Sequence, residues 1–324
     1  MLSLTKRSRL AAAAVGCSLV LAACSSSDDD SVSQPGASGS PAGAKLSGEL
    51  QIDGSSTVAP LSEAAAEGFE EENEGVKVAV GTSGTGGGFK KFCAGETDIS
   101  DASRPIKDEE AMLCASKDIK FEQITVANDG LAVVVNKDSP IECLTVEQLK
   151  KIWEPDSKVN NFNQVDPSFP NLELKLFGPG TDSGTFDYFT DEINGEEGAS
   201  RTDYQPSEDD NFIVQGVQGN PGGLGYFGLS YVEENPDDVK ALGIDSGEGC
   251  VEPSTETVLD GTYKPLGRPL FIYATNKTVE RPEGLAFLEY YIENADEIAK
   301  QALFVPLSDE QKKEAKAKIE TLKG

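Results

Sequence analysis

The chain has 324 residues, with 28 basic and 56 acidic side chains and a formal net charge of −28. Nucleic acid is a poor partner for such a chain, because binding it begins with neutralisation of phosphates by a basic surface. Histidine is absent, which excludes Ser-His-Asp and Cys-His catalysis and every histidine-ligated metal site.

The first 23 residues are typical of a signal peptide for export. Three basic residues precede an apolar segment, residues 10–23, that is too short to span a bilayer. The segment ends in Leu-Ala-Ala-Cys, which resembles the bacterial lipobox, so we expect Cys24 to be lipidated and to begin the mature protein. Cleavage beside an incidental cysteine is the alternative. Residues 24–46 predict a flexible tether, so the protein is expected at the extracytoplasmic face of the cell membrane, held there only by lipid.

Three turns rich in Gly, Ser and Thr each follow a strand pattern and precede a helix pattern. They lie at residues 53–60, 81–88 and 178–186, after strands expected at 49–52, 76–80 and 172–177, and before helices expected at 61–72, 89–93 and 186–193. A helix that begins at such a turn leaves backbone N–H groups without intrahelical acceptors, at the positive end of its dipole. The turns therefore suit a small anion, although Ser and Thr also cap ordinary helices. Their repetition predicts an α/β fold that gathers helix N-termini at one sheet edge.

The glycine spacing does not match a nucleotide-binding loop. Gly87 stands where a P-loop requires lysine, and Phe89 stands where the dinucleotide fingerprint requires its third glycine. Thr85 replaces the glycine that a nucleophile elbow around Ser83 would need. Most acidic residues lie in runs that a solvated surface explains, so a hydrolase with a carboxylate pair is a weaker alternative. We expect no enzyme activity and no cofactor.

Four cysteines remain once the signal peptide is removed and Cys24 is acylated. They are Cys93, Cys114, Cys143 and Cys250. Outside the cytosol these residues can form disulfides in any of three pairings. Cys93 and Cys114 flank one local unit, so we favour their pairing, which leaves Cys143 to pair with Cys250. The close cysteine pairs that a zinc site needs are absent, and we expect no metal.

The length that follows the tether is enough for two lobes. Strand patterns at residues 131–136 and 270–274 are expected to be the two chain crossings between them. The first lobe then contains residues 47–128 and 272–324, and the second contains residues 129–271. The polar segment 156–171 predicts a surface loop, and residues 306–323 predict an amphipathic helix that packs on the first lobe.

From about residue 48 onward, the chain resembles the PstS-type phosphate-binding lipoproteins, the substrate-binding components of the high-affinity phosphate ABC transporter. The resemblance rests on motifs in this order: GSSTVAP at 54–60, GTGGG at 84–88, DISDASRP at 98–105, DSGTF at 182–186 and NPGGLGY at 220–226. It implies a two-lobe α/β fold of the type II periplasmic-binding-protein kind, with the ligand cleft between the lobes. It also implies a monomeric receptor that delivers inorganic phosphate to ABC transporter permease subunits.

The resemblance also implies which residues bind phosphate. Position by position, the donors are Ser56, Thr57, Thr85, Ser183, Gly184 and Thr185. Some relatives have an aspartate where this chain has Ser103, and those relatives have an arginine where this chain has Pro179. Arg104 is then expected to replace that cation as a bidentate fork, with Lys90 and Lys91 as competing candidates.

Selectivity is expected to depend on an acceptor for the ligand's proton. Phosphate at neutral pH carries at least one proton and sulfate carries none, so a buried carboxylate favours phosphate and repels sulfate. Asp182 and Asp101 are the candidates, although alternation along a strand could turn Asp101 away, and Ser103 could accept without a charge. The alternatives are a sulfate or molybdate receptor, a metal-dependent phosphoesterase and an adhesin.

Overall fold

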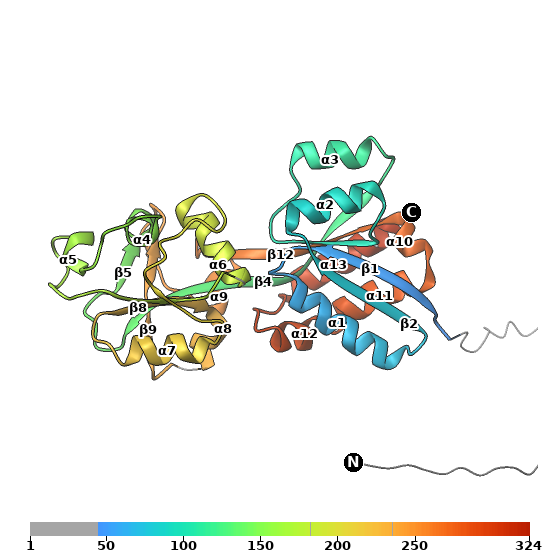
Figure 1. Ribbon diagram of the computed structural model, residues 1–324. Coiled ribbons are helices and arrows are strands. Elements are labelled where there is room, and N and C mark those ends of the chain that lie inside the picture. Colours follow the sequence, from blue (N-terminus) through green and yellow to red (C-terminus); the bar gives the residue numbers. More distant parts are fainter. Residues whose placement is uncertain (1–44, 182, 235) are drawn as a thin grey trace, which may run out of the picture. The chain divides into compact units, whose positions relative to one another are not determined.

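The structure is a computed structural model that describes residues 45–324 except Asp182 and Asn235 (Figure 1). The expected signal peptide, Cys24 and nearly all of the expected tether lie outside the described residues. Within the described part of the chain, no helix has both the length and the apolar character needed to cross a bilayer.

Strands and helices alternate along the described chain. The strands are β1 (Gly48–Gly54), β2 (Val76–Thr82), β3 (Ile99–Ala102), β4 (Phe121–Asn136), β5 (Cys143–Thr145), β6 (Lys175–Gly178), β7 (Gln205–Pro206), β8 (Gly223–Gly228), β9 (Val239–Ala241), β10 (Gly243–Asp245), β11 (Cys250–Val251) and β12 (Gly267–Thr275). The helices are α1 (Ala59–Glu72), α2 (Thr85–Ala94), α3 (Asp108–Ala115), α4 (Val146–Trp153), α5 (Phe162–Val165), α6 (Gly184–Phe189), α7 (Asp210–Gln218), α8 (Leu229–Glu234), α9 (Thr255–Leu259), α10 (Asn276–Glu280), α11 (Pro282–Glu293), α12 (Ala295–Gln301) and α13 (Asp309–Leu322). A π-helical turn, Thr190–Asn194, continues α6.

The larger sheet brings the ends of three parallel strands to one edge. Its strand order is β2-β1-β3-β12-β4-β8-β6-β7, and β9 also pairs with β4. β1 pairs in parallel with both β2 and β3, so the turns that follow these strands lie together. The strands β11, β10 and β5 form a separate small sheet.

Two strands, β4 and β12, pair antiparallel and connect two hydrophobic cores. β4 contributes Ile124 and Val126 to one core and its apolar run at residues 131–135 to the other. Figure 1 shows β4 and β12 between two groups of elements. We call β1–β3 with α1–α3 and α10–α13 the first lobe, and β5–β11 with α4–α9 the second lobe. The strands expected as crossings are parts of this pair, and the residue limits expected for the lobes stay a prediction.

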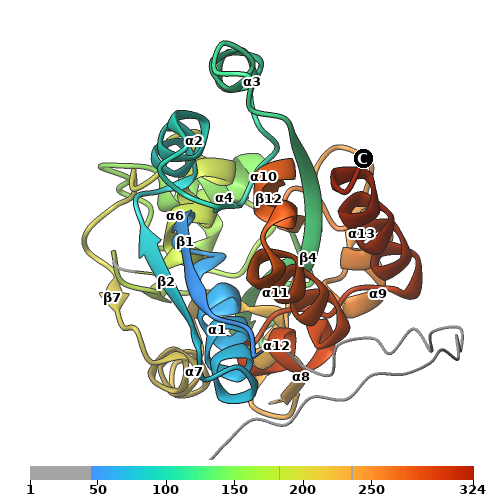
Figure 2. The same cartoon turned by 90° about the vertical axis from the view of Figure 1, so that its right-hand side faces the viewer.

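Aromatic and helix packing fill the two cores. In the second lobe, Tyr226 stacks on Phe189 with ring centroids 3.9 Å apart, and Trp153 meets Tyr226 edge-on. In the first lobe, Figure 2 shows α11, α12 and α13 grouped together, and α13 buries Ala315, Ile319 and Leu322. The helix expected near the C-terminus therefore lies where an amphipathic helix can cover the first lobe.

Two disulfides link segments within the lobes. One joins Cys93 in α2 to Cys114 in α3, and the other joins Cys143 in β5 to Cys250 in β11. These are the pairs that the sequence favours. The expectation that residues 156–171 form only a surface loop is wrong in part, because α5 lies in this segment and buries Phe162 and Val165 against the second core.

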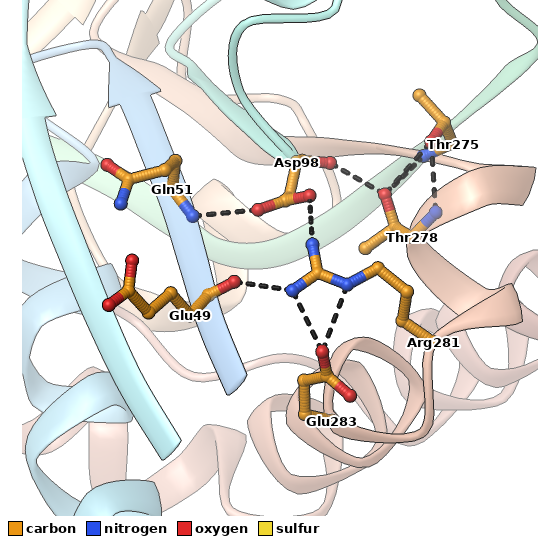
Figure 3. Close-up of polar contacts among 7 residues, drawn as sticks. All are labelled: Glu49, Gln51, Asp98, Thr275, Thr278, Arg281 and Glu283. Carbon is orange, nitrogen blue, oxygen red and sulfur yellow. Dashed lines mark hydrogen bonds and ion pairs between the residues drawn. The ribbon is translucent and has the colours of Figure 1, made fainter. Parts of the chain in front are cut away.

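An arginine ties together three segments of the first lobe (Figure 3). The Arg281 guanidinium lies 2.6 Å from the Asp98 carboxylate, donates to Glu283 on α11, and donates to the backbone oxygen of Glu49 in β1. The other carboxylate oxygen of Asp98 accepts from the Gln51 amide at 2.8 Å. Arg281 therefore holds the first strand to the start of α11.

We expect Arg281→Ala to lower the free energy of unfolding by about 1–2 kcal/mol, because one partly exposed side chain makes several charge-assisted contacts. Lys300→Ala, which removes an exposed ion pair with Glu297, serves as the control and should change stability by less than about 0.5 kcal/mol. Urea unfolding of both variants tests this, and equal effects would show that the Arg281 contacts carry no special weight.

Candidate functional site

A cleft of about 390 Å³ lies at the carboxyl ends of β1, β2 and β3. Its first-lobe wall consists of Ser55, Ser56, Thr57, Ser83, Gly84, Thr85, Gly86, Ser103, Arg104 and Lys107. Its other wall consists of Asp187, Tyr188, Asp191, Glu192 and Glu197 from the second lobe, together with Arg268 from β12. The first-lobe wall carries mostly hydroxyls, backbone amides and cations, whereas the second-lobe wall is acidic.

The turn after β1 contributes Ser55, Ser56 and Thr57 to the cleft. The Ser55 amide donates to the Asp101 oxygen at 3.0 Å, and the Ser55 oxygen accepts from the first amides of the helical turn. Gly54 has φ of +152°, and a side chain there would collide with the Asp101 backbone oxygen. Ser56 and Thr57 then lie just before α1, whose N-cap is Val58.

The turn after β2 is held by a buried carboxylate. Asp53 is only 8 % exposed, accepts a hydrogen bond from Ser83, and forms a 2.6 Å ion pair with Lys91. Next along the chain, the Thr85 hydroxyl accepts from the Ser103 amide at 3.2 Å and lies 3.1 Å from its hydroxyl. Thr85 and Ser103 therefore meet in the cleft, and their role as phosphate ligands stays a prediction. The competing candidate Lys91 is instead bound to Asp53, and neither it nor exposed Lys90 lines the cleft.

Arg104 lies in the cleft but already has an acidic partner. Its two terminal nitrogens each donate to one Glu110 oxygen at 2.8 Å, and this hydrogen bonding raises the pKa of Arg104. A guanidinium has five N–H donors, so donors remain for an anion while Glu110 fixes the orientation of the fork.

Two basic residues that the sequence did not single out, Lys107 and Arg268, line the cleft together with Arg104. The Arg268 guanidinium stacks over the Tyr188 ring at 3.4 Å, and its ion pair with Asp129 is long, at 3.5 Å. Its Nε is buried without a hydrogen-bond partner among the described residues. The sequence contains only a weak indication that Arg268 belongs to the site. Arg268 lies just before the strand expected at 270–274, which is expected to cross between the lobes.

The Ser-Gly-Thr turn of the second lobe lies against the first lobe. Ser183 caps α6 by accepting from the Thr185 amide at 3.2 Å, and the Gly184 oxygen accepts from the Thr57 hydroxyl at 3.4 Å. None of Ser183, Gly184 and Thr185 is among the residues that line the cleft. Their role as ligand donors stays a prediction.

The acidic residues are arranged differently from the expectation. Asp101 is fully buried, accepts from Ser62 at 2.8 Å on the core side of β3, and does not line the cleft. Strand alternation has turned its carboxylate away, and burial raises its pKa to about 7. This argues against Asp101 as the acceptor, and Asp182 lies outside the described residues. Two acids that the sequence did not single out, Asp187 and Glu192, line the cleft, and burial raises the pKa of both.

Known proteins are similar to this chain in sequence and in fold. The model of the PBP superfamily domain matches residues 39–295. Protein SphX of Synechococcus elongatus is 49% identical over 261 residues, which cover 80% of this chain and 77% of that protein. Phosphate-binding protein PstS of Staphylococcus saprophyticus is 39% identical over 315 residues, or 96% of this chain and 93% of that protein.

A solved structure agrees with these relatives. The crystal structure of a possible phosphate binding protein from Planctomyces limnophilus has a TM-score of 0.83 and 44% sequence identity, and covers 86% of this chain and 100% of that one. The expected two-lobe α/β fold and the expected family are confirmed. The chain belongs to the PstS family of phosphate-binding proteins within the PBP superfamily.

Proposed function

We propose that this chain is a lipid-anchored extracytoplasmic receptor that binds inorganic phosphate and delivers it to the permease subunits of an ABC transporter. The observation that carries the proposal is the convergence of three strand-end turns, with their hydroxyls, amides and cations, on one cleft. Relatives named as phosphate-binding proteins support the choice of ligand. The receptor binds and releases its ligand without catalysis and works as a monomer.

The first lobe supplies most of the proposed ligand contacts. Ser56 and Thr85 offer hydroxyls, the Thr57 amide offers a backbone donor, and Ser103 and Arg104 complete this wall. Although the chain has a net charge of −28, charges beyond about 10 Å are screened, whereas donors inside the cleft act directly. Closure of the second lobe would bring Ser183, Gly184 and Thr185 to the anion from the opposite side.

The protein should bind inorganic phosphate at micromolar or tighter affinity, about −8 kcal/mol or better, because several converging donors replace the water around the anion. Isothermal titration calorimetry measures this directly. Absence of heat at millimolar phosphate would refute the receptor proposal. Turnover of a chromogenic phosphate ester that chelators abolish would favour the phosphoesterase alternative instead.

Removal of either cleft arginine should weaken phosphate binding. We expect a loss of about 2–4 kcal/mol for Arg104→Ala, and a smaller loss of about 1–2 kcal/mol for Arg268→Ala, whose guanidinium is shared with Asp129. Lys90→Ala is the control, because that side chain is exposed outside the cleft. Calorimetric titration in which Lys90→Ala loses affinity and the arginine variants do not would place the site elsewhere.

The anchor should be separable from ligand binding. We expect Cys24→Ala to release the protein from the membrane fraction while its affinity for phosphate stays unchanged, since the expected tether that Cys24 begins keeps the anchor apart from the folded lobes. Membrane fractionation after a salt wash, followed by titration of the released protein, checks both parts. A variant that stays with the membrane would show that lipid on Cys24 is not the anchor.

A further inference from the structure

One acidic side chain of the second lobe reaches a proposed phosphate donor in the first. The Ser56 hydroxyl donates to the Asp187 carboxylate across the cleft at 3.4 Å. Asp191, Glu192 and Glu197 line the same wall, but no hydrogen bond from them to a first-lobe hydroxyl is present among the described residues. Asp187 is therefore distinguished from its acidic neighbours by a direct contact with the donor turn after β1.

The backbone around Asp187 fixes this position. α6 begins at Gly184, and a Cβ atom on Gly184 would lie only 2.8 Å from the Thr57 hydroxyl oxygen. This close approach sets the start of α6 directly against the first-lobe turn, and Asp187 follows within the same short helix. An anion that contacts the Ser56 hydroxyl must consequently lie beside the Asp187 carboxylate.

The charges that face Asp187 favour an anion that can donate a proton. Burial, followed by repulsion from Glu197, raises the pKa of Asp187, and the Ser56 hydrogen bond and Arg268 act in the opposite direction. Ser56 has a single hydroxyl proton, so once it donates that proton to a ligand the carboxylate needs another donor. A protonated phosphate oxygen can supply that hydrogen bond. Sulfate cannot, and would place a second negative charge against an unsatisfied carboxylate.

We propose that Asp187 accepts the hydrogen bond from the proton of bound phosphate and is the residue that excludes sulfate. Asp101 lies on the core side of β3 and lacks access to the cleft, so it does not compete for this role. The inference rests on the proposed phosphate receptor and adds the residue that gives it selectivity.

The test compares phosphate and sulfate affinities of the purified wild type, Asp187→Asn, Asp187→Ala and Asp191→Asn by calorimetric titration and competition. Asp191→Asn is the matched control, because it removes an acid from the same cleft wall. We expect both Asp187 variants to narrow the ratio of sulfate to phosphate dissociation constants by about tenfold or more. In Asp187→Asn the ratio should narrow mainly because sulfate binds more tightly. In Asp187→Ala it should narrow also because phosphate binds more weakly. In Asp191→Asn the ratio of sulfate to phosphate dissociation constants should stay within about twofold of wild type, although both affinities can change together because Asp191 acts electrostatically on Arg104.

Three results would overturn the inference. The first is an unchanged ratio in both Asp187 variants, and the second is an equal narrowing in Asp191→Asn, which would indicate a general effect of wall charge. The third is an equal loss of both anions in folded Asp187 variants, which would mean that Asp187 only organises the cleft. A wild type that binds no phosphate would instead refute the proposed function itself.

Discussion

The antiparallel pairing of β4 with β12 joins the two lobes and sets the border of the cleft. Each of the two larger hydrophobic cores includes residues of β4, so the two lobes share one continuous strand. The same pairing sets Arg268 directly opposite Asp129, at the border of the cleft. Packing of both cores against β4 therefore also fixes the position of Arg268 at the cleft.

An acidic chain can bind an anion because its cleft acids and cations are organised locally. Asp53 positions the turn after β2 through Ser83 and Lys91, and Glu110 orients Arg104. In both cases a carboxylate forms an ion pair with a neighbouring basic side chain, and backbone amides and hydroxyls of the cleft remain available to a ligand. The net charge of −28 describes the whole chain, whereas affinity depends on donors within a few ångströms.

Features that are local in the sequence could be predicted, and contacts between distant segments could not. Ser56 and Thr85 follow strand patterns and open helix patterns, so nearby residues were enough to place them at a sheet edge. Arg268 and Asp187 reach the cleft only through the pairing of β12 with β4 and the packing of α6 on Thr57, which no local pattern reports. The orientation of Asp101 likewise depends on which face of β3 is covered. The short helix α5 was not predicted, because Phe162 and Val165 stand within a polar segment whose composition is typical of a surface loop.

We propose that one anion lies between the strand-end turns of the first lobe and α6 of the second. A crystal structure of the protein grown with phosphate tests this claim most directly. We predict a phosphate within hydrogen-bonding distance of Ser56, Thr85 and Arg104, with Asp187 against one of its oxygens. A phosphate bound outside this cleft, or one that contacts only a single lobe, would contradict it.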